Sequence, residues 1–190
     1  MSLDKNKNIT RFIARAGIFS AMAAILYIVG SFIPLYLFSD FLQLHIDEVP
    51  AFIASFAYGP LMGTIVLFVK TLLKLPFTHT ACIGELADLL YSLVFILPAS
   101  FIYKNRRKFS SVLIGFAVGL VCQLVVSFFF NIFVMIPFYG YLYSLPQEFL
   151  DAKWVFGLSA ILPFNVIKDL IVIVITLPTY KSLHKLIDKI

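Results

Sequence analysis

Apolar residues fill long stretches of this chain, and polar residues gather in the short segments between them. Prolines, glycines and charged residues bound the stretches, as they commonly bound helices. We expect six helices, at residues about 11–33, 47–58, 60–75, 80–103, 110–137 and 154–183. The second helix is the short one, since a helix needs roughly 20 residues to cross a bilayer. The six helices are expected to form a single domain over residues 1–190.

Composition places these helices in a membrane. The chain has 190 residues, of which 61% are hydrophobic and 13% are charged. A soluble domain has about 45–50% apolar and about 25% charged residues. The sequence therefore predicts an all-α integral membrane protein. The first apolar stretch is longer than a signal-peptide core and has no clear cleavage site, so we expect it to be retained as a helix.

The net charge of +5 is unevenly distributed. Basic residues cluster around the start of the first helix (Lys5 to Arg15), between the fourth and fifth (Lys104 to Lys108) and at the C-terminus (Lys181 to Lys189). Each cluster adjoins an apolar helix, so the positive-inside rule explains all three better than nucleic-acid binding. With six helices, this rule places both termini in the cytoplasm.

Five polar residues interrupt the apolar helices in what this topology makes the outer leaflet: Glu85, Asp88, Asn131, Asn165 and Lys168. A charged side chain at membrane depth is costly and by default indicates a functional site. Asn165 and Lys168 are three residues apart and share a helix face. Polar groups that converge in an apolar, aromatic surrounding suggest a small-molecule site. The alternative is a structural network in which Lys168 pairs with an acid such as Asp88; Lys70 and Asp169 are left unassigned.

Two segments outside the expected helices bear on this site. Residues 34–45 contain too many interruptions to span, and we expect them to fold onto the membrane face above the cavity. Residues 138–153 contain three tyrosines and predict an aromatic loop at the outer interface.

Small residues at intervals of four form a ridge on the first helix, made of Ala16, Gly17, Ser20, Ala21 and Ala24. Such ridges let helices approach closely in lipid. The ridge fits either packing within the chain or docking onto another membrane protein.

The sequence offers little for catalysis. It has no zinc-protease, nucleophile-elbow, phosphate-loop or dinucleotide motif, and no Cys/His spacing typical of a metal site. A small intramembrane enzyme using Glu85 and Asp88 as acid and base, and an accessory protein with purely structural polar residues, remain as alternatives.

Five stretches carry a resemblance to a known family: residues 41–50 (FLQLHIDEVP), 58–63 (YGPLMG), 70–73 (KTLL), 84–88 (GELAD) and 162–168 (LPFNVIK). The chain resembles the substrate-binding S components of energy-coupling factor (ECF) vitamin transporters, and the proline-phenylalanine-asparagine-x-x-lysine run is most similar to the riboflavin group. Many relatives have Asn at the position of Asp88.

The resemblance implies a multi-pass protein of a prokaryotic plasma membrane that binds riboflavin from outside and needs no cofactor or metal. It implies assembly with a transmembrane coupling subunit, through the ridge on the first helix, and with two ATPase subunits that alone use ATP. Asn131, Asn165 and Lys168 would contact the flavin ring. Leu42, Gln43, Glu85 and Asp88 would lie near the ribityl chain. An S component for another vitamin, such as thiamine, is the nearest alternative.

Overall fold

The computed structural model describes residues 2–32, 42–78 and 82–187, and these residues are almost entirely helical. Residues 34–41 of the expected segment 34–45 lie outside the described residues. Residue 80, the expected start of the fourth helix, also lies outside them. The elements are α1 (Ser2–Phe32), α2 (Val49–Tyr58), α3 (Pro60–Lys74), η1 (Leu75–Phe77), α4 (Ile83–Asn105), α5 (Phe109–Phe130), η2 (Asn131–Met135), α6 (Ile136–Tyr143), α7 (Gln147–Asp151), α8 (Lys153–Phe156), η3 (Gly157–Ile161) and α9 (Leu162–Ile187).

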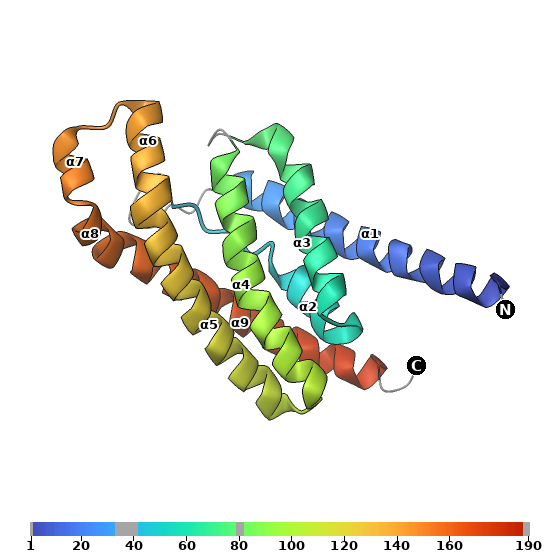
Figure 1. Cartoon of the computed structure of the whole chain (residues 1–190). Coiled ribbons are helices and arrows are strands. Elements are labelled where there is room, and N and C mark those ends of the chain that lie inside the picture. Colours follow the sequence, from blue (N-terminus) through green and yellow to red (C-terminus); the bar gives the residue numbers. More distant parts are fainter. Residues whose placement is uncertain (1, 33–41, 79–81, 188–190) are drawn as a thin grey trace.

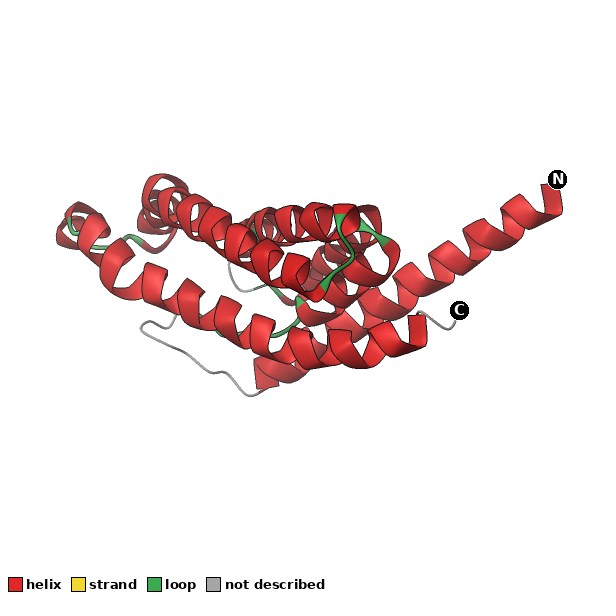
Figure 2. Cartoon of the chain, turned by 90° about the horizontal axis from the view of Figure 1, so that it is seen from below, coloured by secondary structure: helices red, strands yellow, loops and turns green. Residues whose placement is uncertain are grey.

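The helices form an elongated bundle (Figure 1). The N-terminus of α1 and the C-terminus of α9 lie at one end, and α6, α7 and α8 lie at the other. The N-terminal part of α1 extends beyond the other helices (Figure 2). Among the described residues, five helical segments are long and apolar enough to cross a membrane: Asn8–Gly30, Pro60–Phe77, Ile83–Asn105, Phe109–Tyr143 and Lys153–Tyr180.

The short helix α2 lies in the centre of the bundle. It has 10 residues, and every residue from Val49 to Phe56 is buried. A helix that is apolar all round is typical of such a position. Its Phe52 ring contacts the rings of Phe95 on α4 and Phe116 on α5, with centroids 4.8 and 5.0 Å away. This aromatic cluster forms the core where the three helices meet.

Glycines allow α4 and α5 to pack closely. A Cβ at Gly119 would lie 2.4 Å from the carbonyl oxygen of Phe95, and one at Gly115 would lie 2.8 Å from the Cα of Ala99. Backbones this close leave no room for a side chain, so the two glycines of this small-xxx-small pair are packing residues.

The expected end of the fifth helix at residue 137 is wrong, and so is the expected loop at 138–153. Helical structure continues to Tyr143, and α7 and α8 occupy much of the remainder. The cause is the π turn η2, in which the backbone N–H of Ile136 donates to the carbonyl of Asn131, five residues back. Because this turn shifts the hydrogen-bond register just before Pro137, the proline falls in the first turn of α6, where its missing N–H costs little.

The same arrangement occurs before Pro163. The π turn η3 places the N–H of Leu162 on the carbonyl of Gly157, and Pro163 follows at once. The expected sixth helix therefore changes geometry within its N-terminal half. Each of the two asparagines predicted at the site lies in or just after one of these π turns, which often mark functional sites.

Candidate functional site

A cavity of about 210 Å³ lies between α4, η2, α6 and α9. All seven residues predicted for the ligand site line it: Leu42, Gln43, Glu85, Asp88, Asn131, Asn165 and Lys168. They come from four separate parts of the chain, so only the fold brings them together.

Local structure fixes the direction of both asparagine side chains. Asn131 in η2 donates from Nδ2 to the Tyr91 hydroxyl at 2.9 Å and to the Ser127 carbonyl at 2.7 Å. Asn165 on α9 donates to the Ile161 carbonyl at 2.9 Å and accepts from Gln123 at 2.9 Å. These bonds orient both amides at the cavity wall before any ligand binds.

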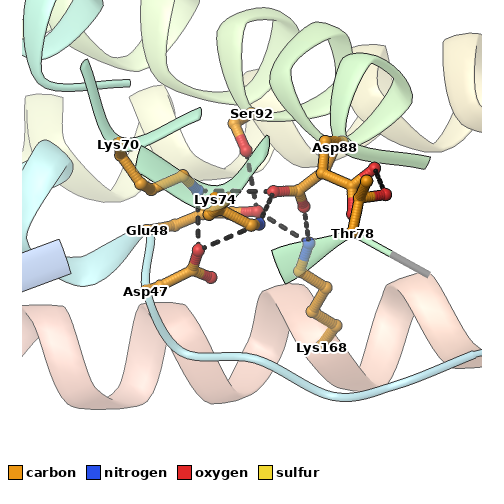
Figure 3. Close-up of polar contacts among 9 residues, drawn as sticks. Asp47, Glu48, Lys70, Lys74, Thr78, Asp88, Ser92 and Lys168 are labelled. Carbon is orange, nitrogen blue, oxygen red and sulfur yellow. Dashed lines mark hydrogen bonds and ion pairs between the residues drawn. The ribbon is translucent and has the colours of Figure 1, made fainter. Parts of the chain in front are cut away.

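Six charged side chains form a closed network beside the cavity (Figure 3). The carboxylates are Asp47, Glu48 and Asp88, and the ammonium groups are Lys70, Lys74 and Lys168. With three charges of each sign, the network is neutral. Neutrality matters because a net charge at membrane depth would be costly.

Asp88 on α4 is the centre of this network. Its Oδ1 lies 2.9 Å from Lys168 Nζ, and its Oδ2 lies 2.8 Å from Lys74 Nζ and 3.4 Å from Lys70 Nζ. Asp47 supplies a second carboxylate to Lys70 at 3.0 Å and to Lys74 at 3.3 Å. Pairing between Lys168 and Asp88, left open by the sequence, is therefore present.

Lys168 has a second carboxylate partner that the sequence did not indicate. Its Nζ lies 2.7 Å from Oε1 of Glu48, directly before α2. An ammonium group has three N–H donors, so two carboxylate partners leave one donor for a ligand. The acid pairing that the sequence left as an alternative is present, and Glu48 joins Asp88 in it.

Asp169, next to Lys168, does not line the cavity. It is 1% exposed, and neither carboxylate oxygen has a hydrogen-bond partner among the described residues. Its side chain therefore belongs to the bundle interior and not to the site.

Glu85, on the first turn of α4, is held by the segment before the helix. It accepts a hydrogen bond from the Thr78 hydroxyl at 2.7 Å, and that hydroxyl accepts one from the backbone N–H of Cys82 at 3.2 Å. Cys82 has a positive φ of 67°. Glu85 thus stands at the cavity wall with one oxygen already bound.

Two titratable groups before α2 have shifted pKa values. Burial lowers the pKa of His45 to about 4, against the opposing effect of Asp47, so the imidazole is neutral near pH 7. Burial raises the pKa of the Asp47 carboxyl, but Lys70 and Lys74 outweigh this effect and hold it below its ordinary value. Asp47 is therefore ionised, as the network requires.

Tyr27 on α1 connects the first helix to the site. Its ring centroid lies 4.7 Å from that of His45 and 4.2 Å from Lys74 Nζ, a cation–π distance. The sequence did not predict these three residues at the cavity. Lys70 and Lys74 do stand four apart on one apolar helix, and that spacing could have indicated a shared charged face.

Aromatic residues close the part of the cavity nearest α6, α7 and α8. Tyr139, Phe149 and Phe156 line it, from α6, α7 and α8. These are the elements that the sequence interpreted as a loop and the beginning of the last helix. The predicted aromatic segment is therefore part of the cavity wall.

The small-residue ridge of α1 divides into two faces. Ala16 and Ser20 are 8% and 1% exposed because they pack against the bundle, which is the alternative of packing within the chain. Gly17 and Ala21 are exposed, Ala24 is half-buried, and a Cβ at Gly17 would meet nothing within 4 Å. Four-residue spacing cannot distinguish the faces because two such series run side by side on one helix.

Comparison with known proteins places the chain in a family. Residues 11–180 match the family described as ECF transporter, substrate-specific component. The riboflavin transporter RibU of Staphylococcus aureus is 33% identical over 159 residues, which are 84% of this chain and 81% of that protein. The riboflavin transporter FmnP of Bacillus subtilis is 27% identical over 139 residues, or 72% of this chain and 73% of that one.

A solved structure of the S component of a bacterial ECF transporter has the same fold. It superposes with a TM-score of 0.77 at 30% identity, and the match covers 93% of this chain and 97% of the other. The likeness therefore extends over nearly the whole of both chains.

Proposed function

This chain belongs to the family of ECF transporter substrate-specific components, and we propose that it is the subunit that captures riboflavin from outside the cell for uptake. Its two riboflavin-transporter relatives carry the proposal. The chain is a multi-pass protein of the plasma membrane and a transport component, not an enzyme. Riboflavin is its cargo, and the family needs no cofactor.

The charge of the cavity supports a neutral ligand. Lys74 and Lys168 face it with positive charge, and Glu85 and Asp88 with negative charge. Riboflavin carries no net charge at neutral pH, so it adds no unbalanced charge to a site at membrane depth.

The polar groups also suit a flavin. In our proposal the third N–H of Lys168 donates to a ring carbonyl, and Asn131 and Asn165 read the imide edge, since an amide both donates and accepts. Leu42, Gln43, Glu85 and Asp88 lie near the hydroxylated ribityl chain. Tyr139 and Phe156 offer apolar surface to the ring faces.

We further propose six membrane-embedded helices with both termini in the cytoplasm. α2 does not reach across the bilayer and leaves room for the cavity above it. The basic segment at Lys104 to Lys108 and the two termini then share the cytoplasmic side, in agreement with the positive-inside rule. Modification of single cysteines, introduced at either end into a variant lacking Cys82 and Cys122, tests this topology.

The partners in this proposal are a transmembrane coupling subunit and two cytoplasmic ATPase subunits. Docking would use the outward face of α1, where Gly17 and Ala21 are exposed and Ala24 is half-buried. Ala16 and Ser20 contribute indirectly, by seating α1 against the bundle.

Titration of the flavin-free protein tests the function. We expect quenching of riboflavin fluorescence at one ligand per chain, and no competition by thiamine or pyridoxine. A protein that takes up no flavin, or prefers another vitamin of the panel, contradicts the proposal.

Two variants test the site separately. Lys168→Ala and Asn165→Ala each remove a hydrogen bond of about 1–3 kcal/mol, which corresponds to roughly 10- to 100-fold weaker binding. Glu148→Gln, on the exposed surface of α7, is the control. Unchanged affinity in both site variants means that the ligand contacts another wall.

A further inference from the structure

Glu48 is buried beside the cavity without reaching it. It is 1% exposed and does not line the cavity, whereas its partner Lys168 does. Its Oε1 lies 2.7 Å from Lys168 Nζ. Whatever Glu48 contributes to a bound ligand therefore passes through Lys168.

One further contact and a buried backbone position restrict Glu48. The Ser92 hydroxyl on α4 donates to its Oε1 at 2.9 Å, so one oxygen receives both a hydroxyl and an ammonium group. The residue stands at the N-cap position of α2, whose first residues are all buried. The Glu48 carboxylate is thus held in one position and can restrain the flexible Lys168 side chain.

Lys168 needs this restraint because its other carboxylate partner, Asp88, also pairs with two other lysines. Asp88 receives three lysines, and only its Oδ1 faces Lys168. A lysine side chain has four rotatable bonds and loses much rotamer entropy when it is held in one conformation. Glu48 and Asp88 impose this restriction before the ligand arrives, which is how preorganisation increases affinity.

We propose that Glu48 is a positioning residue for ligand binding: it fixes the Lys168 ammonium group so that its one remaining N–H points into the cavity. This inference rests on the proposed function, because it takes Lys168 as a ligand contact. It concerns a residue that the ligand does not touch.

A double-mutant cycle tests this role. In the otherwise unmodified protein, Glu48→Gln is expected to weaken riboflavin binding about tenfold, mainly through faster dissociation. In a Lys168→Met background, the same substitution should change the affinity by less than about twofold, because no ammonium group remains to be positioned. An equal loss in both backgrounds overturns the proposal, since Glu48 would then act through the general structure.

Ser92→Ala provides a second test that retains every charge. It removes the hydroxyl that restrains Glu48, and we expect a two- to fivefold loss of affinity that also disappears with Lys168→Met. If Glu48→Gln does not fold, as judged by circular dichroism, the Ser92→Ala cycle decides alone, and a loss that persists with Lys168→Met overturns the proposal. Glu148→Gln is the matched control for loss of a carboxylate.

The cycle separates this inference from the proposed function. Failure of the unmodified protein to bind riboflavin contradicts the function, and the cycle is then measured with the vitamin that binds. Riboflavin binding without coupling between Glu48 and Lys168 contradicts only the positioning role.

Discussion

Replacing Asp88 by Asn removes one charge from the centre of the network and changes the shape of the side chain very little. The carboxylate has three lysine partners, at 2.8, 2.9 and 3.4 Å. After the substitution, Asp47 and Glu48 must balance three ammonium groups. The buried network then carries one uncompensated positive charge.

The size of the effect follows from what each lysine retains. Removal of one partner from a buried ion pair costs about 3–5 kcal/mol when the other charge is left alone. Here Lys70 and Lys74 keep Asp47, Lys168 keeps Glu48, and the amide oxygen of the new Asn still accepts one bond. We therefore expect a loss of about 2–4 kcal/mol in the free energy of unfolding. For a chain of this length that lowers the melting temperature by about 5–15 °C.

Melting in detergent, followed by circular dichroism, measures this loss in ligand-free protein. The decisive comparison is the double variant Asp88→Asn/Lys70→Met, which leaves two neutral pairs, Asp47 with Lys74 and Glu48 with Lys168. Lys70 does not line the cavity, and methionine keeps most of its apolar volume. We expect the double variant to melt above Asp88→Asn alone.

Two outcomes would refute the charge-balance argument. One is a change below about 0.5 kcal/mol for Asp88→Asn, the range of an ordinary surface substitution. The other is a double variant no more stable than Asp88→Asn, which would mean that charge balance does not hold the six side chains together.

Two further substitutions test the bundle. Gly119→Ala places a Cβ 2.4 Å from the Phe95 carbonyl oxygen and should lower the free energy of unfolding by about 1–3 kcal/mol, because it forces α4 away from α5. The control is Gly17→Ala, whose Cβ meets nothing within 4 Å and which should be neutral or slightly stabilising. Equal melting temperatures for the two variants contradict the close approach of α4 and α5. Asp169→Asn removes a carboxyl group with no hydrogen-bond partner among the described residues. It should raise the melting temperature by a few degrees, which corresponds to about 1–2 kcal/mol in the free energy of unfolding. A fall of that size would show that the carboxyl group has a partner.

The sequence predicted the helices and the cavity wall well, because both depend on local signals. Long apolar stretches locate helices, and a polar residue within one of them is conspicuous. Asn131, Asn165 and Lys168 were found in this way, and they meet at one cavity. Leu42 and Gln43 were found only through family resemblance, since nothing in their own chemistry distinguishes them.

The failures arose where the outcome depends on tertiary structure. Pro137 was expected to end a helix, but a π turn placed it in a new first turn. Glu48 directly precedes α2, where an acid suits the helix dipole, so its type and position alone indicate only a local role. Its pairing with Lys168, 120 positions later in the chain, follows from how α2 and α9 pack. The pattern of apolar residues in the sequence does not show which two helices pack together.

The closed network explains how a membrane protein can present lysines to a neutral ligand. Lys74 and Lys168 face the cavity, and alone they would be costly at that depth. Asp47 and Glu48, outside the cavity, supply the balancing charge at 2.7 to 3.3 Å. Because the acids neutralise the lysines from behind, the donors towards the cavity remain available without leaving the membrane site charged. In the proposed site, the carboxylates behind the lysines are therefore as necessary as the lysines that face the cavity.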